Sequence, residues 1–243
     1  MRILLTLSYD GTDFCGYQIQ PNGRTVEEVL ENALYTLTGE KIKTYASGRT
    51  DSGVHAVCQK VHFDTQSSIP ASNFASALNA ILPSDVKVSN SKKVKDTFNA
   101  RFSAKKKTYK YSLYVGDYEE PTVSRYKTLI KVTPDINLMK ECAKIIEGTH
   151  DFKGFMASGS SVKDTVRTVY SIKIIKKGKF IDFYVTGSGF LYNMVRIIVG
   201  TALSVGEGKV NLEQVKSMLL TGERPIKVKT MPSKGLTLYR VTY

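Results

Sequence analysis

The first nine residues alternate between apolar and other side chains, and this pattern predicts a β-strand. Its apolar positions are Ile3, Leu5, Leu7 and Tyr9. A helix is expected next, because Thr25 and Glu28 have the spacing of a capping box at the start of a helical apolar stripe. Gly39 marks its end, since glycine favours the backbone conformation that follows helices. Residues 41–46 and 56–63 then have the composition of two strands.

A second helix is expected to start after Ser72, a candidate cap, and to end at Pro83. Its apolar face is predicted to be Phe74, Ala77, Leu78 and Ile81. The order of strand, helix, strand, loop and strand is typical of a ferredoxin-like unit.

Comparable patterns follow residue 104. Odd positions from 107 to 115 share one face of a predicted strand, and residues 134–148 predict a helix. Residues 165–176 and 179–188 predict two long strands around a turn. We therefore expect an α+β fold of two ferredoxin-like α/β halves, residues 1–103 and 104–243, related by pseudo-two-fold symmetry.

The stretch from Gly189 to Gly200 begins a helix that is apolar on nearly every side, so we expect it to be buried. Arg196 lies within it, where a cation is costly unless a carboxylate meets it. The alternative is that the Arg196 side chain extends to the surface.

Composition narrows the class of protein. Lys and Arg number 35 against 22 Asp and Glu, a formal charge of +13, which favours a polyanionic partner. The 3 cysteines are far apart, so neither a disulfide scaffold nor a zinc site is expected. No apolar run is long enough to span a membrane, and no signal peptide is recognisable. We expect a soluble, cytoplasmic protein.

The loop from Ser47 to His55, between two predicted strands, has the strongest chemical character. Two glycines allow close approach of another molecule to the main chain. Arg49 is placed to keep Asp51 ionised or to bind a phosphate, and His55 titrates near neutral pH. The alternative is an ordinary turn with an exposed ion pair.

Two further features suit a binding site for RNA. Lysines alternate with aromatic residues from Lys105 to Tyr114, so amines can meet phosphates while rings stack on bases. A lysine-guarded edge strand is the alternative. Gln59 shares a predicted strand face with the apolar residues Val57, Val61 and Phe63. It is therefore either a hydrogen-bonded core residue or a support for the loop that carries Asp51.

The loop resembles the G-R-T-D-x-G-V-H signature of the tRNA pseudouridine synthase A (TruA) family. Further segments resemble that family along the whole chain: 9–18, 79–83, 98–104, 190–196 and 231–236. The chain departs from the family pattern at Tyr17, where Trp is usual, at Asn99, where His is usual, and at Met231, where Ala is usual.

The resemblance implies roles for individual residues. Asp51 would be the catalytic aspartate, Arg196 its partner and Tyr109 the ring that packs against the target base. Contacts to the substrate or support of the site would come from Arg49, Gln59, Arg101, His55, Leu236, Tyr17 and Gln18. Packing is the alternative for Tyr17 and Leu236, and a solvated charge for Arg101.

The resemblance also implies conversion of uridine to pseudouridine at tRNA positions 38, 39 or 40 in the anticodon stem-loop, without a metal or other cofactor. A continuous, mainly antiparallel sheet with a central catalytic cleft and a homodimer are further expectations. Apolar strand surface at Ile172, Ile174, Phe183 and Val185 favours the dimer, unless the chain covers it itself.

Two rival functions remain. A non-catalytic RNA-binding or RNA-folding module needs the basic aromatic surface but not Asp51. A hydrolase that uses Asp51 and His55 ranks last, because no second carboxylate or Ser/Cys nucleophile occurs in a recognisable motif.

Overall fold

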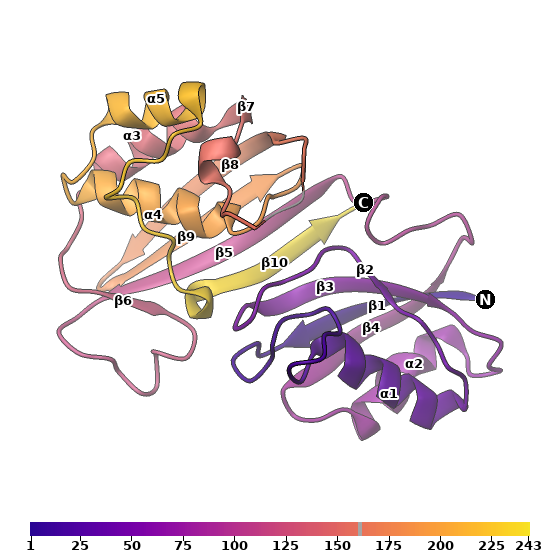
Figure 1. The fold of residues 1–243 in the computed structure, drawn as a ribbon. Coiled ribbons are helices and arrows are strands. Elements are labelled where there is room, and N and C mark those ends of the chain that lie inside the picture. Colours follow the sequence, from indigo (N-terminus) through magenta and orange to yellow (C-terminus); the bar gives the residue numbers. More distant parts are fainter. Residues whose placement is uncertain (160–161) are drawn as a thin grey trace. The chain divides into compact units, whose positions relative to one another are not determined.

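The computed structural model describes residues 1–159 and 162–243. The chain forms two compact units (Figure 1). Unit 1 consists of Met1–Lys105 together with Thr237–Tyr243, and unit 2 consists of Lys106–Leu236. The last strand thus contributes to the unit that the first residues form, whereas the sequence pattern grouped it with the second half.

Unit 1 is a sheet with its helices gathered on one face (Figure 1). Its elements are β1 (Arg2–Tyr9), α1 (Val26–Thr38), β2 (Tyr45–Ala46), β3 (His55–Asp64), η1 (Ala71–Asn73), α2 (Phe74–Ile81), β4 (Val86–Val94) and β10 (Leu236–Thr242). Strand β1 pairs antiparallel with both β3 and β4, β2 pairs antiparallel with β3, and β10 pairs parallel with β3. This is the connectivity expected of a ferredoxin-like unit, with β10 added.

The ends of α1 agree with the sequence prediction. The Thr25 side chain accepts a hydrogen bond from the Glu28 amide, and Gly39 adopts the left-handed conformation at the C-terminal end, with φ of 74°. The cap predicted for the second helix is wrong. A 3-10 turn precedes α2, and the Ser72 hydroxyl bonds to Asn73 instead of capping the helix.

Two details of β2 and β3 also differ from the prediction. The strand expected over residues 41–46 is reduced to Tyr45–Ala46. Val57 was expected to share the buried face with Gln59, but its side chain is exposed. A β-bulge explains this, because the register between β1 and β3 shifts from Leu7 opposite Gln59 to Tyr9 opposite Ala56.

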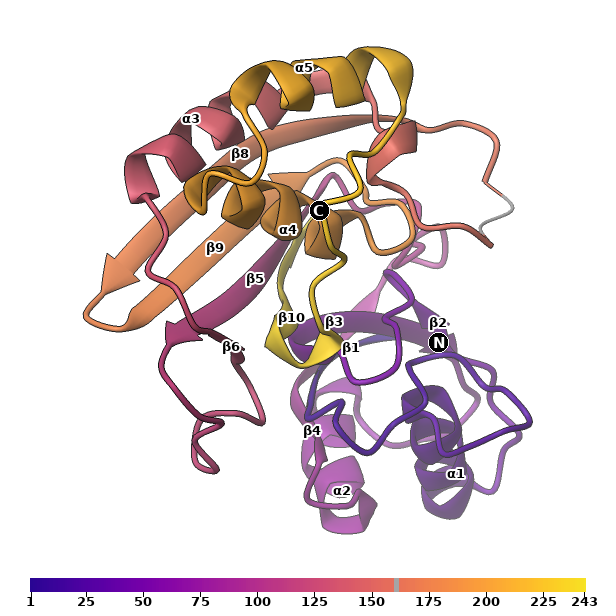
Figure 2. The ribbon, with the colours of Figure 1, turned by 60° about the vertical axis from the view of Figure 1, so that its left-hand side comes forward.

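Unit 2 is also a mainly antiparallel sheet with helices gathered on one side (Figure 2). Its elements are β5 (Lys106–Val115), β6 (Thr128–Ile130), α3 (Ile136–Ile146), β7 (Gly148–Asp151), η2 (Lys153–Phe155), β8 (Val166–Lys177), β9 (Phe180–Gly187), α4 (Met194–Gly206), α5 (Leu212–Thr221) and η3 (Ser233–Gly235). Within unit 2 the strand order is β5-β9-β8-β7, and β6 pairs parallel with β5.

Helix α4 is buried along nearly its whole length, as its apolar sequence predicted. Gly200 lies where the chain passes very close to it, because an added Cβ would meet the carbonyl oxygen of Lys229 at 1.9 Å. Among the described residues, no helix is both long enough and apolar enough to cross a membrane.

The apolar strand surface that favoured a dimer is covered within the chain. Ile172, Ile174, Phe183 and Val185 are all buried, and α3 packs against β8. That argument for a dimer therefore fails, and the dimer stays a prediction.

Candidate active site

The loop from Ser47 to His55 is held from beneath by one buried amide. Gln59 is completely buried, and its Nε2 donates to the Gly48 carbonyl oxygen at 2.6 Å. Its Oε1 accepts from the Ser47 hydroxyl, also at 2.6 Å. Because a buried amide must be hydrogen-bonded, this pair of contacts explains why a polar residue lies on the apolar face of β3.

Thr50, the residue before Asp51, is held in place by hydrogen bonds with Tyr9 and Tyr17. The Tyr9 hydroxyl and Thr50 Oγ1 are 2.7 Å apart, and the Tyr17 amide donates to the Thr50 carbonyl oxygen at 3.0 Å. Gly16 permits this approach with φ of 92°, and an added Cβ would lie 2.8 Å from the same oxygen. The segment 14–17 therefore packs directly on the Asp51 loop.

Ser52 and Gly53, which follow Asp51, are also held in place by hydrogen bonds. The Ser52 hydroxyl donates to the Phe14 carbonyl oxygen at 3.2 Å, and the Gly53 amide donates to the same oxygen at 3.3 Å. The Val54 amide closes a turn onto the Asp51 carbonyl at 3.1 Å, and Gly53 has φ of 75° in that turn. Asp51 itself is half-buried, so its side chain stands on an immobilised backbone without being enclosed.

His55 faces inward rather than toward solvent. Its Nδ1 accepts a hydrogen bond from the Gly11 amide at 2.9 Å and lies 3.2 Å from an Asp10 carboxylate oxygen. Gly11 is also in close contact with this loop, since an added Cβ would meet the Val54 carbonyl oxygen at 2.0 Å. His55 thus joins the end of β1 to the beginning of β3.

Tyr17 and Gln18 have different environments although they are adjacent. The Tyr17 ring is only 1% exposed and lies 6.5 Å from the Tyr9 ring. Burial raises the pKa of Tyr17 well above its ordinary value. These observations favour packing for Tyr17, whereas Gln18 is exposed.

The two arginines assigned to unit 1 are exposed, as a phosphate contact requires. Burial raises the pKa of Glu27, and the charge of Arg49 opposes that rise. The Arg101 guanidinium lies 5.5 Å from the centre of the Phe102 ring. Asn99, at the position where the family usually has His, accepts from the Arg101 and Phe102 amides at 2.9 and 3.1 Å and so fixes this turn.

In unit 2, Arg196 lies in the first turn of α4 with its guanidinium held on two sides. Nε donates to the Met231 carbonyl oxygen, and Nη1 donates to Asn193 Oδ1, each at 2.6 Å. Asn193 precedes the helix with φ of 59°, which is rare for a residue other than glycine. These contacts orient Arg196 before any substrate binds.

Tyr109 and Leu236 are mostly buried in unit 2. The Tyr109 ring packs edge-to-face on Phe190 with 5.3 Å between ring centroids, and Leu236 is 6% exposed. Tyr111 is a core residue, and its hydroxyl bonds to Thr128 and to the Pro232 carbonyl oxygen.

The sequence did not indicate the anchors of the loop. Thr50 and Ser52 are positioned by Tyr9, Phe14 and Gly16, and Arg196 is positioned by Asn193. These contacts join residues far apart in the sequence or involve main-chain atoms, so no local sequence pattern reveals them. Gly16 inside an aromatic segment was the one visible signal, since a glycine there suggests a close approach or a positive φ.

Comparison with known proteins identifies the family to which the chain belongs. A model of the family described as tRNA pseudouridine synthase matches residues 6–103 and 142–243. The chain belongs to the tRNA pseudouridine synthase family. Both matched ranges together cover most of the chain, including the Asp51 loop and helix α4.

Similar members of this family come from several bacteria. The chain is 46% identical to a tRNA pseudouridine synthase A of Bacillus licheniformis and 45% identical to one of Bacillus subtilis, in each case over 100% of the chain and 99% of the relative. A solved structure titled "Crystal Structure of a Cbf5-Nop10-Gar1 Complex" has a TM-score of 0.38 and 16% identity, over 83% of this chain and 45% of that one. That similarity is too low to support an argument.

Membership in the tRNA pseudouridine synthase family makes the protein an isomerase of uridine in tRNA. The family and the enzyme class predicted from the sequence are confirmed. The non-catalytic RNA-binding module and the hydrolase are therefore not needed to explain the Asp51 loop.

Proposed function

We propose that Asp51 is the catalytic aspartate of a synthase that modifies uridine at tRNA positions 38, 39 or 40 in the anticodon stem-loop. The observation that carries this proposal is the Asp51 loop, whose backbone is fixed on both sides of a half-buried carboxylate. Rigid support of a reactive group lowers the cost of reaching the productive geometry.

The reaction needs few chemical groups. The glycosidic bond of uridine breaks, and the ribose rejoins the same base through a carbon atom, so substrate and product contain the same atoms. No oxidant, reductant or group donor enters this balance. One carboxylate is sufficient, either as a nucleophile at the ribose or as a base that removes a ribose proton.

We assign Arg196 as the partner of the Asp51 carboxylate and Tyr109 as the ring that packs against the target base. Support for Arg196 comes from its half-buried position and from two hydrogen-bonded nitrogens, which hold the guanidinium in one orientation. Tyr109 is supported by its packing on Phe190, which fixes the plane of the ring. Leu236 would form an apolar wall of the uridine pocket.

The remaining assigned residues divide by exposure. Arg49, Arg101 and Gln18 are exposed and are proposed to contact the RNA. Gln59, His55 and Tyr17 are buried and are proposed to support the Asp51 loop rather than to touch the substrate. The target base must leave its stack to reach Asp51.

A cytoplasmic homodimer that binds one tRNA across both subunits is a further part of this proposal. Its support is the family resemblance and the excess of basic residues, since a two-fold dimer presents two basic surfaces to an elongated RNA. Sedimentation equilibrium without RNA tests it, and a monomer at micromolar concentration with full activity would exclude it.

The test of the catalytic assignment is Asp51→Asn, which removes the charge with little change in volume. We expect a folded protein that binds tRNA and forms no pseudouridine in a single-turnover assay. Asp13→Asn, at an exposed position in the neighbouring loop, is the matched control and should keep normal turnover. Measurable turnover by Asp51→Asn would exclude the assignment, and pseudouridine found only outside positions 38–40 would exclude the proposed site in tRNA.

A further inference from the structure

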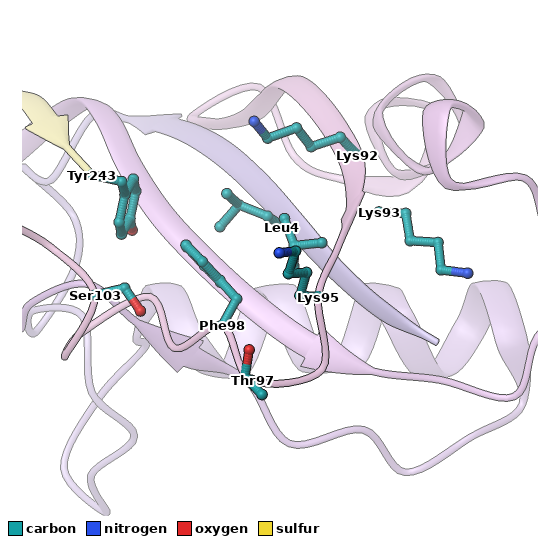
Figure 3. Close-up of a pocket in the computed structure, with 9 residues that line it drawn as sticks. Leu4, Lys92, Lys93, Lys95, Thr97, Phe98, Ser103 and Tyr243 are labelled. Carbon is teal, nitrogen blue, oxygen red and sulfur yellow. The ribbon is translucent and has the colours of Figure 1, made fainter.

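Unit 1 contains a hollow of about 750 Å³ that is lined by Leu4 of β1, the end of β4 and residues that follow it (Figure 3). Residues that line it and bear on the argument are Leu4, Lys92, Lys95, Phe98 and Tyr243. A volume of this size is within the range of pockets that hold small ligands.

The floor of the hollow lies on the face of the sheet that the helices leave uncovered. Ile3 and Leu5 are completely buried on the other face, where Phe63, the partner of Ile3 in β3, contacts Phe74 of α2. Because side chains alternate along a strand, Leu4 points the opposite way. Leu4 pairs with Lys92 of β4, so an apolar side chain and an amine stand next to each other there.

Two aromatic rings form one wall, and main-chain contacts hold both in place. The Phe98 and Tyr243 ring centroids are 4.8 Å apart. The Tyr243 hydroxyl donates to the Ala100 carbonyl oxygen at 2.9 Å, and the Arg2 guanidinium donates to the Phe98 carbonyl oxygen at 2.8 Å. Both rings are only half-buried, so part of this wall is open to a ligand.

The amines at the hollow have no carboxylate partners among the residues that the structure describes. Lys92, Lys93 and Lys95 are exposed, and none of them forms an ion pair there. The nearest acidic residue in sequence is Asp96, whose carbonyl oxygen accepts from Arg2. Lys95 and Leu4 both line the hollow, and in Figure 3 the Lys93 side chain extends away from the two rings.

Two partly open rings and unpaired amines, beside a Leu4 side chain that is itself buried, together match one class of ligand. Bases stack on aromatic rings, while amines neutralise the phosphates that flank them. We propose that this hollow binds an unpaired nucleotide of the tRNA, a nucleotide other than the uridine that is modified. This inference rests on the proposed function, because it takes tRNA as the ligand.

The separation from the Asp51 loop supports a distinct nucleotide. Leu4 at the hollow and Tyr9 under Thr50 belong to the same strand, five residues apart, which corresponds to about 17 Å. One nucleotide does not fill both places. The hollow therefore contributes to the affinity for tRNA and to its placement, and not to the chemical step.

The test compares two double variants with the same loss of charge. Lys92→Gln/Lys95→Gln removes two amines from the hollow, and Lys140→Gln/Lys144→Gln removes two exposed amines from α3 in unit 2. Binding of an unmodified tRNA transcript is measured from 50 to 200 mM salt. Loss of two phosphate contacts should reduce the slope of log K against log salt by about 1.4 to 1.8 in the first variant only.

Kinetics and a ring variant complete the test. We expect the first double variant to raise KM and to keep the wild-type kcat, and Phe98→Leu to weaken tRNA binding without changing the salt slope. The inference would be overturned if the two double variants had equal salt slopes, or if Lys92→Gln/Lys95→Gln lowered kcat. If the wild-type protein binds tRNA through the hollow but forms no pseudouridine, the proposed function fails and the hollow remains a site for RNA.

Discussion

Gly16→Ala is expected to disturb the Asp51 loop although Gly16 belongs to a different segment. The backbone of Gly16 has φ of 92°, a conformation that side chains rarely adopt. An added Cβ would lie 2.8 Å from the Thr50 carbonyl oxygen and 3.4 Å from the Asp51 carbonyl carbon. Since both neighbours are main-chain atoms, relief of the contact requires a shift of the peptide that carries Asp51.

The magnitude is obtained by comparison with Gly39, which also has a positive φ, 74°, but where an added Cβ would meet nothing within 4 Å. Gly39→Ala should therefore show the backbone strain alone, about 1–2 kcal/mol of unfolding free energy. Gly16→Ala adds the clash, about 1–3 kcal/mol, for a total of about 2–5 kcal/mol. Because displacement of a catalytic group by 1 Å costs about 100-fold in rate, a smaller shift should lower kcat by on the order of tenfold.

Two measurements check this pair of variants. Urea unfolding followed by circular dichroism gives the loss of stability, and single-turnover conversion of uridine in a tRNA transcript gives the rate. We expect Gly39→Ala to keep the wild-type rate and Gly16→Ala to bind tRNA but to react slowly. Equal losses of stability in both variants together with a wild-type rate for Gly16→Ala would refute the role assigned to Gly16.

Two further predictions follow from buried and paired groups. Gln59→Met removes the hydrogen bonds to the Asp51 loop at nearly constant volume, so we expect the free energy of unfolding to fall by about 2–4 kcal/mol and kcat to fall as well. The control Gln66→Met, at an exposed position, should change neither quantity. Normal turnover by Gln59→Met would contradict this prediction. The hydrogen bond from Arg24 holds the pKa of Asp85 in the folded protein below its ordinary value of 3.8. The Asp85 carboxylate therefore stabilises the fold fully above pH 3.8, and this contribution is lost as the pH falls through the pKa of Asp85 in the folded protein. The free energy of unfolding of Asp85→Asn should be lower than that of the wild type at pH 7, and the two values should converge at acidic pH. A difference in unfolding free energy that does not depend on pH would contradict this prediction.

Elements with local signals were predicted well. The capping pair of Thr25 and Glu28 and the terminal Gly39 gave the limits of α1, and the all-round apolar sequence gave the burial of α4. Helix α5 was missed although Asn211 and Gln214 form a capping box there, because its apolar stripe is weak.

Features that depend on pairing between distant strands were not predictable. The exposure of Val57 results from a bulge in the register of β1 and β3, which no local pattern records. The addition of β10 to unit 1 depends on parallel pairing of Thr237 and Leu238 with β3, more than 180 positions away in the sequence. A signature motif therefore located the candidate site, and the strand pairing around it determined its support.

On the proposed function, the Asp51 loop has to be rigid and also bind a polyanion, and the distribution of charge around it allows both. Its anchors next to Asp51 are uncharged: the hydroxyl of Tyr9, the amide of Gln59 and main-chain groups of Phe14. The contact of His55 with the Asp10 carboxylate lies at the end of the loop, where β3 begins. Neutral hydrogen bonds of this kind are insensitive to salt and to the arrival of phosphates, unlike exposed ion pairs. The basic side chain of the loop, Arg49, is exposed and takes no part in those anchors. On the proposed function, binding of RNA then requires little ordering of the loop, so the binding free energy remains available to extract the target base and place it against Asp51.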